Sequence, residues 1–256
     1  MEGFLYFSSL KEFLRPGRLL PWIVLAFAAM ALGVAWKHLD PNASQAEQYS
    51  NVAFILVFRL LALTSAVYTT AIVSQEVEQK TIVYLLTRPV PRWKLLVFRW
   101  LASVTAVFIV GAIGAVLLSA GVYGSPSKND LLTNDLWALF LGACAYGALF
   151  LLVSLAFNRA MIICLLFAFG WETSVPNMPG EIYYASIFSH LQSIAQHPSP
   201  AQSGPKALQL ISGEMNANAL SAKTSLPILL ILTVVLVAIS AWWFTHFEYV
   251  PREDAE

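Results

Sequence analysis

The side chains best suited to chemistry are few in this sequence of 256 residues, and their spacing matches no common catalytic pattern. Neither HExxH nor CxxC occurs, so no zinc site is predicted, and no GxxxxGKS or GxxxxGKT string could form a phosphate-binding loop. The histidines lie far apart: His38, His190, His197 and His246. Serines occur within apolar runs, but no histidine accompanies them, as a serine nucleophile would require. We therefore expect no enzyme activity, metal or cofactor in this chain itself.

One polar segment does show regular spacing, and it covers residues 74–94 with the sequence SQEVEQKTIVYLLTRPVPRWK. Its residues follow the arrangement E-x-x-T-x-x-x-L-x-x-x-P-x-x-R, formed by Glu78, Thr81, Leu85, Pro89 and Arg92. Acidic residues before the short apolar run and arginines after it suit the dipole of a short helix. The composition is typical of a docking element, although a solvated turn between two membrane spans would have a similar one.

The composition indicates which elements must position these residues. Hydrophobic residues make up 58% of the chain, charged residues 12%, and the mean hydropathy is +0.66, which leaves too little polar surface to coat a soluble globule. Fifteen basic residues balance fifteen acidic ones, so no charged field favours nucleic acid as a partner. Both cysteines lie in apolar runs, which argues against a disulfide framework.

Apolar runs of about 17 to 25 residues predict membrane-spanning helices. We expect an all-α polytopic membrane protein that forms a single transmembrane domain over 1–256. Six spans are predicted, at 19–36, 52–74, 95–121, 136–157, 160–175 and 225–247. Residues 1–18 have the spacing of an amphipathic interfacial helix, 75–94 form a loop, and 172–224 form a segment with short helices on the opposite side.

The distribution of basic residues predicts the orientation. Six spans with the N-terminus in the cytoplasm place ten basic residues there: Lys11, Arg15, Arg18, Lys80, Arg88, Arg92, Lys94, Arg99, Arg159 and Arg252. The outer side receives four: Lys37, Lys128, Lys206 and Lys223. Because cytoplasmic loops carry an excess of lysine and arginine, we expect a multi-pass protein of the cell (inner or plasma) membrane with both termini cytoplasmic.

Arg59 is the outstanding intramembrane charge, because it lies well inside a predicted span, where a charge is costly unless it faces protein or water. It either lines a translocation path or binds an anionic headgroup, or else it snorkels or pairs with an acid such as Glu172. Thr64 and Ser65 continue the polar character of this span, either along a route or between packed helices. Glycines in spans three and four, including Gly142 and Gly147, predict close helix packing.

The 74–94 motif resembles the loop of ABC-2 type permeases, the membrane subunits of ATP-binding cassette transporters. Lys80 stands where the usual form has glycine. The amphipathic N-terminus, six spans and outer segment also resemble this family. The resemblance implies that the loop holds a coupling helix, with Glu76, Glu78, Thr81, Arg88 and Arg92 as contacts to the ATPase. Arg159, in the turn between spans four and five, is a candidate second contact, or simply a basic residue in a tight turn.

The resemblance further implies partners: two ABC ATPase subunits, which would bind ATP and Mg, and a second permease subunit in a homodimer or heterodimer. Transport, with export favoured, would then be the function, and the substrate is left open. Two rival hypotheses remain at this point. The first is a non-transporting membrane scaffold or assembly factor coupled to an ATPase. The second is an ion-coupled secondary transporter, which would be expected to carry intramembrane acids or broken helices.

Overall fold

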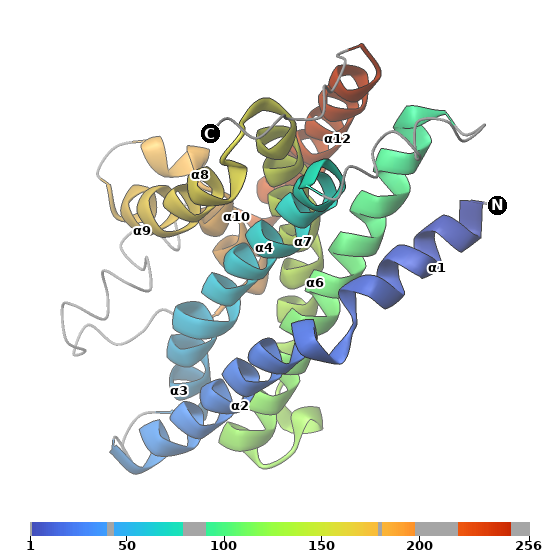
Figure 1. Ribbon diagram of the computed structural model, residues 1–256. Helices are drawn as coiled ribbons and strands as arrows, with labels where there is room; N and C mark the ends of the chain where they lie inside the picture. Colours follow the sequence, from blue (N-terminus) through green and yellow to red (C-terminus); the bar gives the residue numbers. More distant parts are fainter. Residues whose placement is uncertain (1, 40–43, 79–90, 179–180, 198–219, 247–256) are drawn as a thin grey trace.

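The computed structural model describes residues 2–39, 44–78, 91–178, 181–197 and 220–246, and helices are the regular structure throughout these ranges (Figure 1). The helices of the first half are α1 (Glu2–Phe13), α2 (Pro16–Leu39), α3 (Gln45–Val52), α4 (Phe58–Glu78) and α6 (Arg92–Tyr123). Those of the second half are α7 (Leu132–Ala156), α8 (Ala160–Leu166), α9 (Glu172–Ser174), α10 (Ile187–Ala195) and α12 (Ala222–His246). Short 3₁₀ turns are η2 (Pro126–Lys128), η4 (Val175–Asn177) and η5 (Ile182–Ala185).

Within the described ranges, six helical segments are long and apolar enough to cross a membrane: Pro16–His38, Gln45–Ile72, Trp93–Tyr123, Leu132–Ala156, Ala160–Asn177 and Ala222–His246. They confirm the expected all-α polytopic class. Two of them contain a π-helical stretch, η1 (Ala53–Val57) between α3 and α4 and η3 (Phe167–Trp171) between α8 and α9. Because a π-turn adds a residue to the helical repeat, it changes the direction in which the following side chains point.

Three helices form the centre of the bundle. Burial differs among the most apolar 18 residues of each span. Of these, 67% are buried in the span of α4, 56% in that of α6 and 72% in that of α7, against 17% for α2 and 22% for α12. Helix α2 packs on α6, and α12 packs on α7 (Figure 1). The large exposed apolar side chains of α2 and α12, such as Phe27 and Ile231, suit contact with lipid.

Glycines allow the central helices to approach closely. A Cβ atom added to Gly142 of α7 would lie 2.6 Å from Leu61 Cδ2 of α4 and 2.7 Å from Leu191 Cδ1 of α10. At Gly147 it would lie 3.1 Å from Trp100 Nε1 of α6. The predicted packing role of these two glycines is therefore confirmed.

Helix α1 leaves the bundle at the start of α2 and runs across α6 (Figure 1). Its apolar residues divide between two sides, since Phe13 is only 4% exposed whereas Phe4 is 72% exposed. The Tyr6 hydroxyl lies 2.9 Å from the Thr105 hydroxyl of α6, which fixes the helix to the bundle. An amphipathic helix docked in this way fits the position expected at a membrane interface.

Candidate functional site

The predicted coupling residues lie at the end of the bundle where α4 finishes and α6 begins. Glu76 and Glu78 are in the last turn of α4, and Arg92 is the first residue of α6. Thr81 and Arg88 lie outside the described residues, as does the predicted coupling helix. Because α6 and α7 each run the length of the bundle, the exposed Arg159 between α7 and α8 returns to this same end.

The base of this loop is joined across α4 and α6 by polar contacts. The Arg99 guanidinium of α6 donates to the backbone carbonyl of Ile72 of α4 at 3.4 Å. Deeper in the bundle, the hydroxyls of Thr69 and Ser103 lie 3.2 Å apart. Both helices also pack against α7. Both helices are continuous from the loop into the core. A displacement applied between Glu78 and Arg92 would therefore be carried by α4 and α6 to their contacts with α7.

Arg59 is held by the outer end of span five and by the segment that follows it. It lies in the first turn of α4, directly after η1, and its Nη1 donates to the backbone carbonyl of Glu172 at 2.5 Å. Its guanidinium carbon lies 4.0 Å from the centre of the Phe188 ring of α10, a cation–π distance. The structure thus places Glu172 beside Arg59, with the backbone carbonyl as the observed acceptor.

The Glu172 carboxylate is used to begin α10. Glu172 follows η3 and is 1% exposed. One carboxylate oxygen accepts from the Ser186 hydroxyl at 2.7 Å and from the Phe188 backbone N–H at 2.9 Å, and the other accepts from the Ile187 N–H at 3.2 Å. These groups satisfy the free N–H donors at the start of a helix and place a negative charge at its positive end. Arg59 and Glu172, which follow the two π-helical stretches, thus join α4 to α9.

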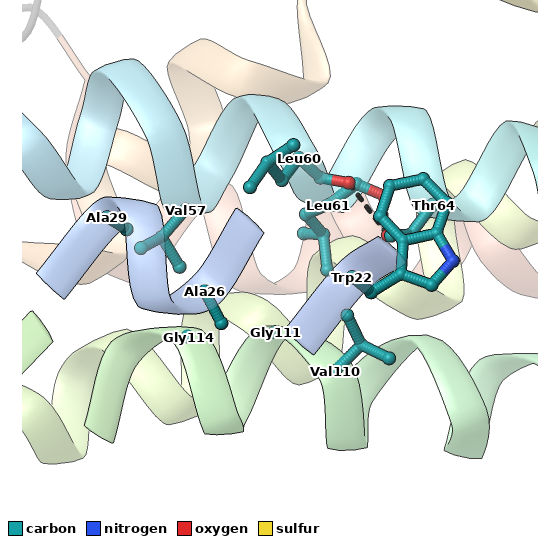
Figure 2. A pocket seen from close by; sticks show the side chains of 10 residues that line it. All are labelled: Trp22, Ala26, Ala29, Val57, Leu60, Leu61, Thr64, Val110, Gly111 and Gly114. Carbon is teal, nitrogen blue, oxygen red and sulfur yellow. Dashed lines mark hydrogen bonds between the residues drawn. The ribbon is translucent and has the colours of Figure 1, made fainter. Parts of the chain in front are cut away.

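Thr64 points in another direction, into a cavity between α2, α4 and α6 (Figure 2). The cavity has a volume of about 20 Å³, enough for one water, and its other lining side chains are apolar. The Thr64 hydroxyl donates to the Leu60 carbonyl of its own helix at 2.7 Å. Ser65 is fully buried and does not line this cavity. The structure therefore does not bring Arg59, Thr64 and Ser65 together at one site.

A buried polar cluster at the opposite end of the bundle was not anticipated from the sequence. Asp135, in the first turn of α7, accepts the Tyr49 hydroxyl at 2.5 Å, and its other oxygen lies 2.6 Å from His197 Nε2. The centre of the His197 ring lies 4.5 Å from that of Phe54 of η1, and the two rings are tilted by 36°. The partners of Asp135 are 86 and 62 residues away, and no local spacing joins them. The cluster connects α3, α7 and the second residue after α10.

A second missed contact joins α10 to the start of α12. His190 Nε2 lies 3.0 Å from the Tyr184 carbonyl, and its Nδ1 lies 3.0 Å from the Ser225 hydroxyl. Because a carbonyl only accepts, Nε2 carries the proton, and Nδ1 accepts from Ser225. Burial lowers the pKa of His190 below its ordinary value. In the parts of the chain that the structure describes, no three His, Cys, Asp or Glu side chains group closely enough for a metal.

Comparison with known proteins supports the interpretation given by the loop and the six spans. A family model described as ABC-2 family transporter protein matches residues 16–248, which is most of the chain. The comparison with curated proteins gives no match. The family is that of transmembrane subunits that work with ABC ATPases, so the chain is not itself the ATPase. With this match over nearly its whole length, and six helices in the described parts that are long and apolar enough to span a membrane, the chain belongs to the ABC-2 family of transporter proteins.

Proposed function

We propose that this permease couples ATP hydrolysis on separate nucleotide-binding subunits to the export of a substrate across the membrane. Two ABC ATPase subunits would bind ATP and Mg²⁺, and a second permease subunit, identical or different, would complete the assembly. In this arrangement the C-terminal end of α4 and the N-terminal end of α6 face the ATPases, and both termini of the chain are cytoplasmic.

The observation that supports this proposal most directly is the attachment of the 79–91 segment to two central helices. Helix α4 continues to Glu78, six residues past the end of its apolar span at Ile72, and α6 begins at Arg92. The contacts of Arg99 with Ile72 and of Thr69 with Ser103 join the two helices. A rigid pair of this kind transmits a push from a docked partner as a rigid-body movement. Glu76, Glu78, Thr81, Arg88, Arg92 and Arg159 are the proposed contacts.

The three intramembrane candidates take different parts in the proposal. Thr64 borders the cavity between α2, α4 and α6, so movement of α4 against α2 would widen a space beside it. Arg59 acts at the other face of α4, where its contacts with Glu172 and Phe188 hold α9 and α10 over the bundle. Ser65 lies between packed helices. On this proposal Arg59 controls the outer segment and Thr64 borders the route.

The test is purification of the chain with the product of an adjacent open reading frame that contains a P-loop. We expect the two proteins to copurify in mild detergent. The double variant Glu78→Ala, Arg92→Ala should lower the permease-dependent ATPase activity by about tenfold or more, since an interface contact removed at its centre costs about 1.4 kcal/mol or more. ATPase activity is measured with and without the permease.

The matched control is Lys223→Ala, which removes an exposed charge near the start of α12 at the opposite end of the bundle. This variant should retain wild-type ATPase stimulation. Failure of any nucleotide-binding protein to copurify, or equal activity in the wild type and the double variant, would overturn the proposal.

A further inference from the structure

A second cavity lies between α2 and α4 at the end of the bundle where α1 joins α2. Its volume is about 240 Å³, twelve times that of the cavity beside Thr64. The lining combines a cation with apolar and aromatic groups: Arg18, Pro21, Trp22, Val67, Tyr68 and Ala71. A concave site with one charged group and mostly apolar walls is suited to an amphiphile with a charged head.

Arg18 is the cation at this cavity, and its bonding is incomplete. Nη1 is buried and makes no hydrogen bond to any residue that the structure describes. Nη2 lies 3.7 Å from a carboxylate oxygen of Glu12, which is longer than a good charged hydrogen bond. The Arg18 side chain as a whole is 32% exposed, so the accessible part of the guanidinium can take an anionic acceptor.

The position of Arg18 in the fold adds to its attraction for an anion. Its ion pair with Glu12 is long, at 3.7 Å. Arg18 lies in the first turn of α2, where the helix dipole adds to the attraction for an anion. Charge complementarity therefore favours a negatively charged ligand.

The remainder of the lining fits the boundary between headgroups and acyl chains. The rings of Trp22 and Tyr68 lie 6.3 Å apart between centres, and the Tyr68 hydroxyl lies 3.5 Å from the Arg18 carbonyl. Tryptophan and tyrosine are enriched at this depth of a bilayer because their rings have an apolar body and a polar tip. Val67 and Ala71 of α4 add apolar surface to the wall.

We propose that this cavity binds one anionic phospholipid from the leaflet on the α1 side of the membrane. Arg18 binds the phosphate, Trp22 and Tyr68 flank the headgroup, and the wall of Pro21, Val67 and Ala71 contacts the first part of an acyl chain. A lipid at this position joins α2 to α4 at the end of the bundle nearest the 79–91 segment. The proposal concerns the permease chain alone and does not depend on ATPase coupling.

The test is native mass spectrometry of the full chain, purified in mild detergent and supplied with phosphatidylglycerol or phosphatidylcholine. We expect one phosphatidylglycerol to be retained in preference to phosphatidylcholine. Arg18→Gln should reduce the retained fraction at least about fivefold, since a basic residue near a membrane surface gives roughly that attraction to an anionic lipid. Ala71→Phe, which keeps every charge and fills the apolar half, should reduce it similarly.

Arg15→Gln is the matched control because Arg15 is exposed, lies one turn before Arg18 and does not line the cavity. It should change retention much less than Arg18→Gln does, because an exposed charge outside the cavity acts on a bound headgroup only through solvent that screens it. Equal losses in Arg15→Gln and Arg18→Gln would reduce the effect to general surface charge and overturn the proposal. So would equal retention of phosphatidylcholine, or full displacement of the lipid by millimolar inorganic phosphate, which would indicate a simple anion site. A variant that loses the lipid but still stimulates the ATPase, or one that keeps the lipid but no longer stimulates the ATPase, distinguishes failure of this proposal from failure of the proposed function.

Discussion

A carboxylate without exposed surface must be satisfied by its neighbours, and Asp135 meets this requirement through Tyr49 and His197. We predict that Asp135→Asn destabilises the protein by about 2 kcal/mol or more, because it weakens two buried hydrogen bonds to a charged group. In a thermal unfolding experiment in detergent, this loss corresponds to a fall of about 5 °C in the midpoint for a chain of this size.

Asp130→Asn provides the control for this measurement. Asp130 is exposed and precedes α7 by two residues, so its replacement removes the same charge without a buried partner. Its midpoint should lie within about 1 °C of the wild type, since surface substitutions usually change stability by less than about 0.5 kcal/mol. Similar midpoints for the two variants would show that the Asp135 cluster contributes no stability.

His190 should make the packing of α10 on α12 sensitive to acid. Burial lowers the pKa of His190, so the folded protein binds a proton there less readily than the unfolded chain does. The stabilising contribution is therefore complete above the ordinary histidine pKa of about 6.5, and it is lost as the pH falls from there toward the folded-state value.

The measurement is the difference in unfolding midpoint between wild type and His190→Gln from pH 8 to about pH 5, a range chosen to bracket ordinary histidine titration. We expect the variant to be less stable at pH 8 and the gap to narrow as the pH falls. Taking the difference between the two proteins removes the contribution of other titrating groups. A gap that is constant or widens in acid would contradict the assignment.

The sequence allowed some residue roles to be predicted and left others out. Arg59 was singled out because a charge in an apolar run is conspicuous, and Glu172 was named among its candidate partners. The detailed bonding did not follow, because the acceptor at Arg59 is a backbone carbonyl and the Glu172 carboxylate caps α10. Tyr49, Asp135 and His197 had no shared pattern, since their contact depends on how three separate elements pack.

At the scale of elements, Gly142 sets how closely α7 approaches its neighbours. We predict that Gly142→Leu destabilises the bundle by about 1–3 kcal/mol, because even the first side-chain carbon would overlap Leu61 and Leu191. Thermal unfolding measures the loss. Gly170→Leu is the control, since nothing lies within 4 Å of a Cβ atom there. If the double variant Gly142→Ala, Leu191→Ala has an unfolding midpoint above that of Gly142→Leu, overpacking is the cause of the loss. A wild-type midpoint in Gly142→Leu would contradict the prediction.

The attachment of α10 gives another prediction for an element. Arg59→Met removes the bond to Glu172 and the charge against Phe188 but retains a long apolar side chain. Loss of a charged hydrogen bond of about 1.5–3 kcal/mol should then let α10 open more often.

Labelling of Ser189→Cys, in a background with Cys144 and Cys164 replaced by Ala, reports this opening because Ser189 is only 4% exposed. We expect the labelling rate to rise about tenfold or more in the Arg59→Met variant. The control is Thr64→Ala, at the other face of α4, which should label at the original rate. Equal rates in the Arg59→Met and parent proteins would show that Arg59 does not hold α10.

At the scale of the whole molecule, the fold class could be predicted because a bilayer restricts the chain so strongly. A spanning backbone has to satisfy its own polar groups, so each apolar run of sufficient length predicts a helix. The same runs do not reveal which helices are central. Those of α7 and α12 have similar apolar character, yet 72% of the most apolar 18 residues are buried in one and 22% in the other. Small residues such as Gly142 indicated close packing, but the partners depend on three-dimensional arrangement.

Orientation is the remaining property of the whole molecule that the basic residues predict. Ser8 lies on α1 at one end of the bundle, and Ser127 lies in η2 after α6 has crossed to the other end; both are exposed. With ten basic residues against four, we expect Ser8→Cys to face the cytoplasm and Ser127→Cys to face outward.

Labelling intact cells with a membrane-impermeant maleimide, in the background lacking Cys144 and Cys164, tests this prediction. Ser127→Cys should react in intact cells, and Ser8→Cys should react only after the membrane is permeabilised. The reverse pattern would invert the protein and place the ends of α4 and α6 away from cytoplasmic ATP, which would also exclude the proposed ATPase contacts. Reaction of both positions in intact cells would mean that an even number of helices, or none, crosses the membrane between the two sites. The basic residues would then have failed to predict the topology, because the charge asymmetry can set an orientation only if α2 to α6 cross as three spans.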